Sequence, residues 1–440
     1  MINLFDAYDE ATRDLHHSLL KAGYTHPTVV IDDNGFLPEG VYSPYGFFLG
    51  EPTQKKPARY FNQVDKPALW EIIGSGTDAA IYDKGEKRAR IFYAKVEQAR
   101  IVRTVEWLDN NQTVRSIDYY NQYGRKYAHT IFDAAQQAVT TTYYTVEGRE
   151  GIVENHLTDD LLVHDQGKVH VFRNKIDFLK YAIERMGFSY DQIYYNRLSL
   201  PFSFVYQLKE AGSDVLFWQE PIHEAIPGNM QAILRGETRT RKILVQNKQD
   251  YQRLVALLAA QQTSVEVAYL GYDYDFKQAN NGSNQALIMT NSDQIEQLTE
   301  LVTQCPTVVF HIAAVTEMSE HLMRFGNYPN VQLYPNIAPK KIASLYQQSA
   351  FYLDINYGNE LNQALRTAFD HQLVIFAFHQ TQHNPTFIGP ENRWDKAESH
   401  QLASALTACV TDKATLAARL DAQLAFANLS TSAEYRQALS

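Results

Sequence analysis

The chain has 440 residues, of which 45% are hydrophobic and 12% aromatic, so it is long and apolar enough for two or three packed domains. Its formal net charge of −10 disfavours contact with polyphosphate, which argues against a nucleic-acid partner. The presence of only two cysteines, an N-terminus without a basic-then-apolar signal pattern and the lack of an apolar run of roughly 18 residues predict a soluble, cytosolic protein.

The first elements predict the start of a doubly wound α/β domain. A strand at 2–5 precedes a helix, and a second strand at 28–31 follows it. Gly23 is expected to end this helix. The turn at 6–9 holds no glycine that would let a phosphate approach the backbone, so we expect no nucleotide there. The helix itself is predicted from apolar residues that recur on one face: Ala11, Leu15, Leu19 and Leu20.

Between residues 42 and 172 the hydrophobic pattern changes to a period of two. Successive runs rich in Val, Ile, Thr and Tyr are separated by short polar turns, which is typical of antiparallel strands joined by hairpins. The acidic pair Asp159-Asp160 lies between two such runs and is interpreted as a turn rather than a cation site. We therefore predict a β-meander inserted into the first α/β domain.

Alternating strands and helices resume after residue 173, and a second set begins near Lys242. This set continues through a strand at 373–378, and residues 402–427 predict C-terminal helices. The predicted fold class is α/β, with two Rossmann-like domains and an inserted meander. The expected domains are 1–41 with 173–241 for the first, 42–172 for the insertion and 242–440 for the second.

The segment from 351 to 378 has the most specific pattern in the chain. An apolar strand ends at Asp354, a polar turn follows at 356–360, a helix runs to about His371 and a second buried strand comes next. This strand, turn and helix resemble the donor-binding segment of GT-B glycosyltransferases, which consist of two Rossmann-like domains. The resemblance predicts a GT-B-like fold with a nucleotide-sugar frame in the second domain.

Retaining members of the GT-B class carry two glutamates separated by seven residues in this segment. Eight positions make just over two helical turns, so both carboxylates face one ligand. The matching positions here are Asn359 and Thr367, and a shift by one residue gives Glu360 but then Ala368. The glycines that would expose amides to a diphosphate are also replaced, by Leu361, Asn362 and Gln363. The pattern predicts a vestigial site without catalytic residues.

Two further residues of this vestigial site have competing interpretations. Active relatives place an Arg and a Lys after the first strand of the second domain, and only Lys248 stands in the corresponding segment 245–249. The alternative interpretation of Lys248 is a surface residue, and Glu360 can be either a helix-capping residue or a retained ligand contact. The histidines, including His379 and His383 around a predicted loop, show no metal spacing, so we expect no metal and no cofactor.

The predicted meander is rich in aromatic residues with polar tips. Such side chains offer a large contact area at small entropic cost, which suits an extended polar peptide or sugar. The alternative is that they form ordinary cross-strand pairs on a half-buried sheet. The residues predicted to bind an acceptor on this surface are Trp107, Tyr119, Tyr120, Tyr127 and Tyr143.

A degenerate GT-B frame with an inserted meander resembles the stabilising subunit of the glycosyltransferase pair that serves the accessory secretion system of Gram-positive bacteria. The insertion, the segment 286–293 and the segment 353–360 carry the resemblance. It implies a non-catalytic subunit that pairs with a homologous catalytic glycosyltransferase, in a heterotetramer at the cytoplasmic face of the membrane. It also implies binding of a serine-rich adhesin whose Ser and Thr hydroxyls receive N-acetylglucosamine or glucose.

Two other functions stay open at this level. The chain can be interpreted as an active retaining UDP-sugar glycosyltransferase that uses Glu360 and Lys248 in an unusual register. It can also be interpreted as a free-standing carbohydrate-binding protein built on the meander. Sugar transfer by this chain alone distinguishes the first alternative, and binding to free sugars rather than to serine-rich peptide distinguishes the second.

Overall fold

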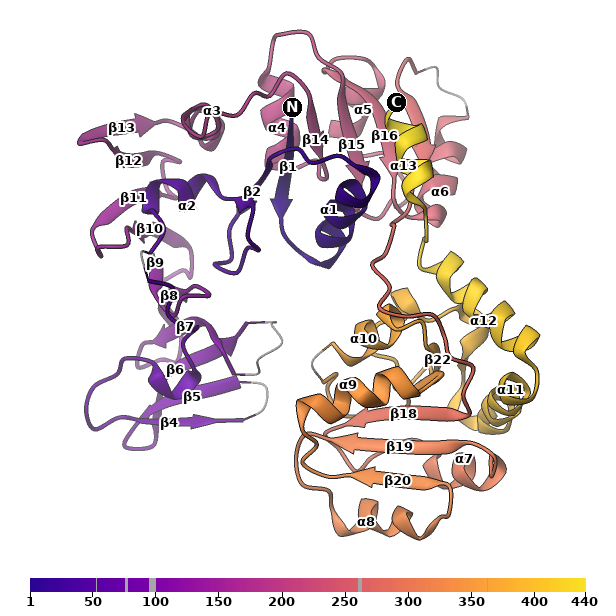
Figure 1. Cartoon of the computed structure of the whole chain (residues 1–440). Coiled ribbons are helices and arrows are strands. Elements are labelled where there is room, and N and C mark those ends of the chain that lie inside the picture. The colour runs from indigo at the N-terminus through magenta and orange to yellow at the C-terminus, as the bar shows by residue number, and fades with distance from the viewer. Residues whose placement is uncertain (53, 76–77, 95–99, 260–262, 362) are drawn as a thin grey trace. The chain divides into compact units, whose positions relative to one another are not determined.

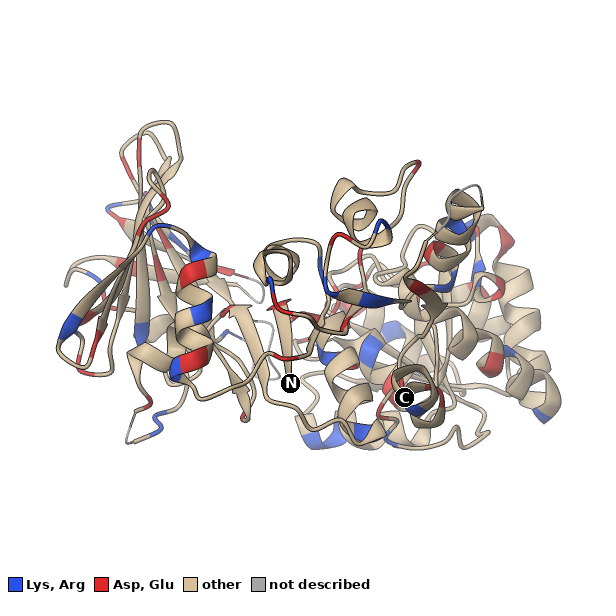
Figure 2. Cartoon of the chain, turned by 90° about the horizontal axis from the view of Figure 1, so that it is seen from above, with Lys and Arg blue, Asp and Glu red and all other residues tan. Residues whose placement is uncertain are grey.

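A computed structural model gives the fold as two compact units, Met1–Leu270 (unit 1) and Gly271–Ser440 (unit 2). Figure 1 shows the elements of each unit. Acidic and basic residues stand side by side on the same elements (Figure 2), which accords with ion pairs within one helix such as Arg366–Asp370. The structure describes the whole chain except residues 53, 76–77, 95–99, 260–262 and 362.

Unit 1 is built on a parallel sheet of seven strands in the described residues, in the order β17-β16-β15-β14-β1-β2-β3. Its strands are β1 (Ile2–Ala7), β2 (Thr28–Asp32), β3 (Val41–Tyr42), β14 (Ile193–Tyr195), β15 (Asp214–Trp218), β16 (Thr240–Val245) and β17 (Glu266–Tyr269). Its helices are α1 (Glu10–Ala22), α2 (Pro44–Leu49), α3 (Lys175–Arg185), α4 (Leu200–Gln207), α5 (Gly228–Leu234) and α6 (Lys248–Leu258).

Helix α1 forms as its sequence predicts, with one correction. Asp9 caps the first turn by accepting a hydrogen bond from the backbone N–H of Thr12, and Gly23 ends the helix in the left-handed conformation at φ 97°. Leu15 and Leu19 are fully buried, but Leu20 is 42% exposed. The buried face of α1 is therefore narrower than predicted, and Leu20 lies at its solvent edge.

A second sheet in unit 1 is the predicted antiparallel meander. Its ten described strands pair in strict chain order from β4 to β13, so each strand bonds to its sequence neighbour. The sheet begins at residue 71 rather than 42, because Ser43 caps and Pro44 begins the short helix α2. The strands are β4 (Glu71–Gly74), β5 (Asp78–Asp83), β6 (Glu86–Tyr93), β7 (Val102–Leu108), β8 (Val114–Tyr120), β9 (Lys126–Phe132), β10 (Ala138–Tyr144), β11 (Glu150–Asn155), β12 (Leu161–Asp165) and β13 (Lys168–Phe172).

The predicted boundary between the α/β domains at residue 242 is wrong. Strand β16 pairs in parallel with β15, with Leu216 opposite Ile243, and β17 pairs with β16. Both strands and helix α6 therefore complete the first sheet, and the division falls after Leu270. A strand–helix–strand repeat has the same hydrophobic pattern in either sheet, so periodicity carries no signal for where one domain ends.

Unit 2 is a second doubly wound domain, whose described parallel sheet has the order β20-β19-β18-β21-β22-β23. Phe351 and Phe376, on neighbouring strands, are fully buried and stack with ring centroids 6.1 Å apart. The strands are β18 (Gln285–Thr290), β19 (Val309–Ala314), β20 (Val331–Tyr334), β21 (Phe351–Asp354), β22 (Val374–Phe378) and β23 (Arg393–Trp394). The helices are α7 (Leu298–Gln304), α8 (Glu320–Met323), α9 (Pro339–Gln348), α10 (Ala364–Asp370), α11 (Ser399–Thr411), α12 (Lys413–Phe426) and α13 (Ser432–Leu439).

Candidate functional site

The natural ligand crevice of unit 2 lies between β18 and β21, where the strand order reverses. The loops that follow these two strands are hydrogen-bonded to each other. The backbone N–H of Glu296 donates to the Ile355 carbonyl at 2.8 Å, and that of Tyr357 donates to the Gln294 carbonyl at 3.0 Å. The two loops thus close over the position where an open doubly wound domain accepts a ligand.

Asn356 and Gly358 hold this closed arrangement from inside. The Asn356 side chain is 2% exposed, donates to the Met289 carbonyl at 3.2 Å and accepts from the Gly358 N–H at 3.0 Å. A Cβ atom on Gly358 would lie 2.0 Å from Oδ1 of Asn291, so a side chain here would displace the Asn291 side chain in the loop after β18. Polar groups that a diphosphate would need are therefore already bonded within the protein.

His383 ties the same loop to the end of β21. Its Nδ1 lies 2.5 Å from Oδ1 of Asp354 and its Nε2 lies 2.6 Å from the Gly358 carbonyl oxygen. Both partners are acceptors, so the ring must donate from both nitrogens and is an imidazolium. The hydrogen bond to Asp354 raises the pKa of His383 to about 9. Sequence analysis missed this contact, because the two partners are 29 residues apart.

The predicted vestigial residues Asn359, Glu360 and Thr367 all lie on this loop and the helix that follows it. Glu360 Oε1 accepts from the backbone N–H of Leu365 at 3.1 Å, so its carboxylate caps the start of α10. The Thr367 hydroxyl donates to the Gln363 carbonyl of its own helix at 3.0 Å. Asn359 is exposed, and the predicted neighbour Asn362 lies outside the described residues. The geometry favours the capping interpretation of Glu360.

Glu360→Ala is expected to lower the free energy of unfolding by about 1 kcal/mol, as loss of a helix cap does. Because the carboxylate bonds to the protein, the substitution should leave UDP-N-acetylglucosamine binding by the isolated chain unchanged. Denaturant unfolding and calorimetric titration measure the two effects. Asn359→Ala, one residue away and exposed, is the control with unchanged stability.

Lys248 does not belong to this site, contrary to the sequence prediction. It is the first residue of α6 and exposed, and α6 is part of unit 1. The first strand of unit 2 is β18, and the loop after it carries Asn291, Ser292 and Asp293 instead of basic residues. Lys248 was assigned to the vestigial site because the domain boundary was predicted at residue 242. The loop after β18 itself holds no cation that could pair with a diphosphate.

A network of side-chain amides lies at the carboxyl edge of the parallel sheet of unit 1. Asn196, Gln219 and Gln246 each directly follow a buried parallel strand. Gln219 Nε2 donates to Gln246 Oε1 at 2.7 Å, and Asn196 Nδ2 donates to Gln219 Oε1 at 2.9 Å. The sequence analysis did not single these residues out. An amide residue directly after each of three parallel strands could have predicted the network, because the carboxyl ends of parallel strands lie at the same edge of a sheet.

The predicted aromatic surface of the meander is only partly exposed. Tyr120 is 3% and Tyr127 is 7% exposed, so these two residues are corrected to the interior. Tyr127 donates its hydroxyl to the Asp33 carbonyl at 3.0 Å, which fixes the meander to the segment after β2. The indole N–H of half-buried Trp107 donates to Asp118 at 2.8 Å. Tyr119 and Tyr143 are half-buried.

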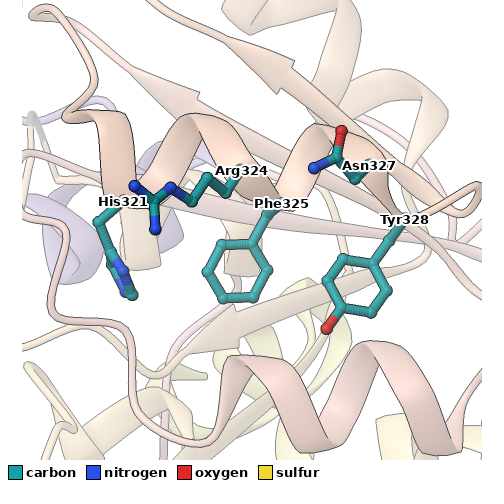
Figure 3. Close-up of a pocket in the computed structure, with 5 residues that line it drawn as sticks. All are labelled: His321, Arg324, Phe325, Asn327 and Tyr328. Atoms are coloured by element: carbon teal, nitrogen blue, oxygen red, sulfur yellow. The ribbon is translucent and has the colours of Figure 1, made fainter.

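A shallow cavity of about 490 Å³ lies on unit 2, next to the edge strand β20. The rings of His321, Phe325 and Tyr328 point to the same side of this segment (Figure 3), and Phe325 stacks on Tyr328 with centroids 5.8 Å apart. These residues precede β20 and therefore lie near the amino ends of the strands. Ligand crevices of doubly wound sheets form at the carboxyl ends, so this cavity lies outside the crevice of unit 2.

The described residues contain no group of three or more His, Cys, Asp or Glu side chains placed to hold a metal ion. Within the same residues, no helix has the length and apolar character needed to cross a membrane.

Comparison with known proteins relates the chain to one family over nearly its whole length. Models of the GtfB N-terminal, middle and third domains match residues 2–48, 70–173 and 175–257, and the GftB/GlyA-F C-terminal domain matches 286–423. A Streptococcus gordonii protein named UDP-N-acetylglucosamine–peptide N-acetylglucosaminyltransferase stabilizing protein GtfB is 43% identical over 97% of this chain and 96% of its own length.

Solved structures agree with the sequence comparison. A chain of the GtfA/B complex bound to UDP and GlcNAc is 42% identical, covers 100% of this chain and 99% of its own, and superposes with a TM-score of 0.94. The pneumococcal O-GlcNAc transferase GtfA shares the fold, with a TM-score of 0.51 at 13% identity over 99% and 97% of the two chains. The GT-B-like fold class predicted from the sequence is confirmed.

Proposed function

The chain belongs to the GtfB family of stabilising proteins for UDP-N-acetylglucosamine–peptide N-acetylglucosaminyltransferases, and on this premise we propose how it serves as the non-catalytic subunit of such a complex. It pairs with a homologous catalytic glycosyltransferase and stabilises it. It also holds a serine-rich polypeptide so that the catalytic subunit can transfer N-acetylglucosamine to Ser and Thr hydroxyls. A GtfA/B complex is the assembly of its structural relative.

The closed crevice of unit 2 is the observation that carries the non-catalytic role. A retaining donor site needs carboxylates for sugar and ribose hydroxyls and amides or cations for the diphosphate. Here Glu360 caps a helix, Asn359 and Thr367 replace the carboxylate pair, and His383 binds the loop carbonyl of Gly358. In the part of this site that the structure describes, the basic side chain His383 is bonded to Asp354 and Gly358 and is not free to stabilise the charge developing on a leaving nucleotide.

The composition of the meander supports an acceptor-binding role. A disordered serine-rich chain buries little apolar surface, so a broad polar and aromatic sheet suits weak, repeated contacts with it. Trp107, Tyr119 and Tyr143 keep part of their surface exposed on this sheet. The adhesin identity of the acceptor, the heterotetramer, accessory-system export and a peripheral position at the cytoplasmic membrane face remain predictions from the family resemblance.

Separate assays of the chain, its catalytic partner and the complex test this function. We expect the chain alone to transfer no sugar from UDP-N-acetylglucosamine, to bind a serine-rich peptide, and to raise the unfolding temperature of the partner in the complex. Donor turnover by the chain alone that disappears in Glu360→Ala would establish the alternative of an active transferase. A partner whose stability and peptide glycosylation do not depend on this chain would contradict the proposal.

A further inference from the structure

A cavity of about 250 Å³ lies in unit 1 where the parallel sheet meets the meander. Asp6 and Asp32 reach it from the carboxyl ends of β1 and β2, and Tyr127 and Tyr143 reach it from the central meander strands β9 and β10. The carboxyl ends of parallel strands are where doubly wound sheets bind ligands. We call this space the Asp32 cavity.

Most polar groups around the Asp32 cavity are already bonded within the protein. Lys175 Nζ pairs with Glu154 at 2.6 Å, and the hydroxyl of Tyr45 donates to the same carboxylate at 3.2 Å. Asp33 Oδ1 accepts from the Gly35 N–H at 2.7 Å. These bonds fix the walls of the cavity and leave their polar groups satisfied.

Asp32 and Tyr143 are the exceptions. Among the described residues, neither the Asp32 carboxylate nor the Tyr143 hydroxyl has a hydrogen-bond partner, although both residues line the cavity. Burial raises the pKa of the Tyr143 hydroxyl well above its usual value, so the group stays protonated and can both donate and accept. An ionised carboxylate only accepts, so Asp32 requires a donor from its ligand.

The charge of the cavity restricts the chemistry of that ligand. Asp6, Asp32 and Asp33 contribute three carboxylates. Of the cations near them, Lys175 is paired with Glu154, and Arg197 is shared between Asp6 at 3.8 Å and Asp9, so negative charge prevails. Such a field opposes phosphate and nucleotide groups. Carboxylates beside tyrosine rings suit a neutral group that donates hydroxyl hydrogen bonds and lays an apolar face on an aromatic ring.

We propose that the Asp32 cavity binds an uncharged, hydroxyl-bearing group of the acceptor polypeptide, with Asp32 accepting from the hydroxyl and Tyr143 bonding to the same group. The inference rests on the proposed acceptor-binding function and assigns residues to it. Two sources supply this chemistry: the Ser or Thr side chain itself, and a sugar already attached to it. At about 250 Å³ the cavity is smaller than a typical drug-binding pocket of ~300–1,000 Å³, so it holds one such group.

Titrations with three peptides test the proposal on the chain in complex with its catalytic partner. One peptide is serine-rich, the second carries O-linked N-acetylglucosamine on the same serines, and the third has alanine at those positions. Asp32→Asn and Tyr143→Phe are each expected to weaken binding of at least one hydroxyl-bearing peptide about tenfold. Neither variant should change binding of the alanine peptide. An effect confined to the unmodified or the glycosylated peptide identifies the side chain or the sugar as the ligand.

Both substitutions remove groups without a protein partner, so the unfolding temperature should not fall. Tyr206→Phe, at an exposed position on α4, and Asp421→Asn, at an exposed position on α12, are matched controls with unchanged binding. Affinities within twofold of the unsubstituted chain, or an equal loss for the alanine peptide, would overturn the cavity assignment and leave the proposed function standing. Failure of the unsubstituted complex to bind any of these peptides would overturn both.

Discussion

His383→Gln is expected to lower the free energy of unfolding of unit 2 by about 3 kcal/mol at pH 6, because one unit of pKa shift equals ~1.36 kcal/mol and the pKa of His383 rises from 6.5 to about 9 on folding. The substitution leaves the Asp354 carboxylate buried at 1% exposure without its cation. Glutamine can still donate one hydrogen bond but carries no charge.

The sign of the pH dependence follows from the raised pKa. Stability from the His383 ion pair is fully present below about pH 6.5 and is lost as pH rises through about 9. The difference between the variant and the unsubstituted chain should therefore shrink toward pH 10. Urea unfolding at several pH values measures it, with His379→Gln, an exposed neighbour, as the control. A difference that stays constant from pH 6 to pH 10 would show that the ring is not charged in the folded protein.

Asp214→Ala is expected to destabilise unit 1 by about 3–5 kcal/mol, since it leaves a buried guanidinium without its counter-charge. Asp214 is fully buried and Arg239 is 5% exposed, and Arg239 Nε lies 3.0 Å from Asp214 Oδ2. Asp214 also accepts from the Ile193 N–H at 2.8 Å. The ion pair thus holds together the amino ends of β14, β15 and β16.

A paired substitution separates burial of charge from loss of packing. Asp214→Leu combined with Arg239→Met removes both charges, and it should recover most of the stability that Asp214→Ala loses. Thermal unfolding monitored by circular dichroism compares the three variants. Equal destabilisation by the single and the double substitution would mean that hydrogen bonds at this edge, such as that from Ile193, matter more than the charge.

The sequence identified the strand, turn and helix of β21 and α10 because local apolar runs and polar turns define them without reference to distant residues. The missing carboxylate pair was predicted by comparing this segment with the glutamate spacing of the GT-B enzymes that it resembles. The spacing of residues in the sequence does not show which side chain of the folded protein occupies the place of a ligand. His383, after β22, contacts Asp354 and Gly358, after β21, and this contact depends on the path of the chain in the folded domain.

The aromatic residues of the meander show a different limit. The alternation of side chains along a strand predicts that Tyr127 and Ala128 face opposite sides of the sheet. It does not predict which side is covered by other segments. The segment at 33–37 packs against the meander and places the Asp33 carbonyl on the Tyr127 hydroxyl. Because this segment covers Tyr127, the residue lies in the interior, and only long-range contacts determine that.

The order of strands in unit 1 has a consequence for how the polypeptide acquires its structure during synthesis. Each meander strand bonds to the strand made just before it, whereas β1 must find β14, with Ile2 opposite Ile193. At translation rates of ~5–20 residues per second, strand β14 is synthesised roughly 10–40 s after β1, so β1 waits that long for this partner. The meander, with only local pairings from β4 at one edge to β13 at the other, has time to form first.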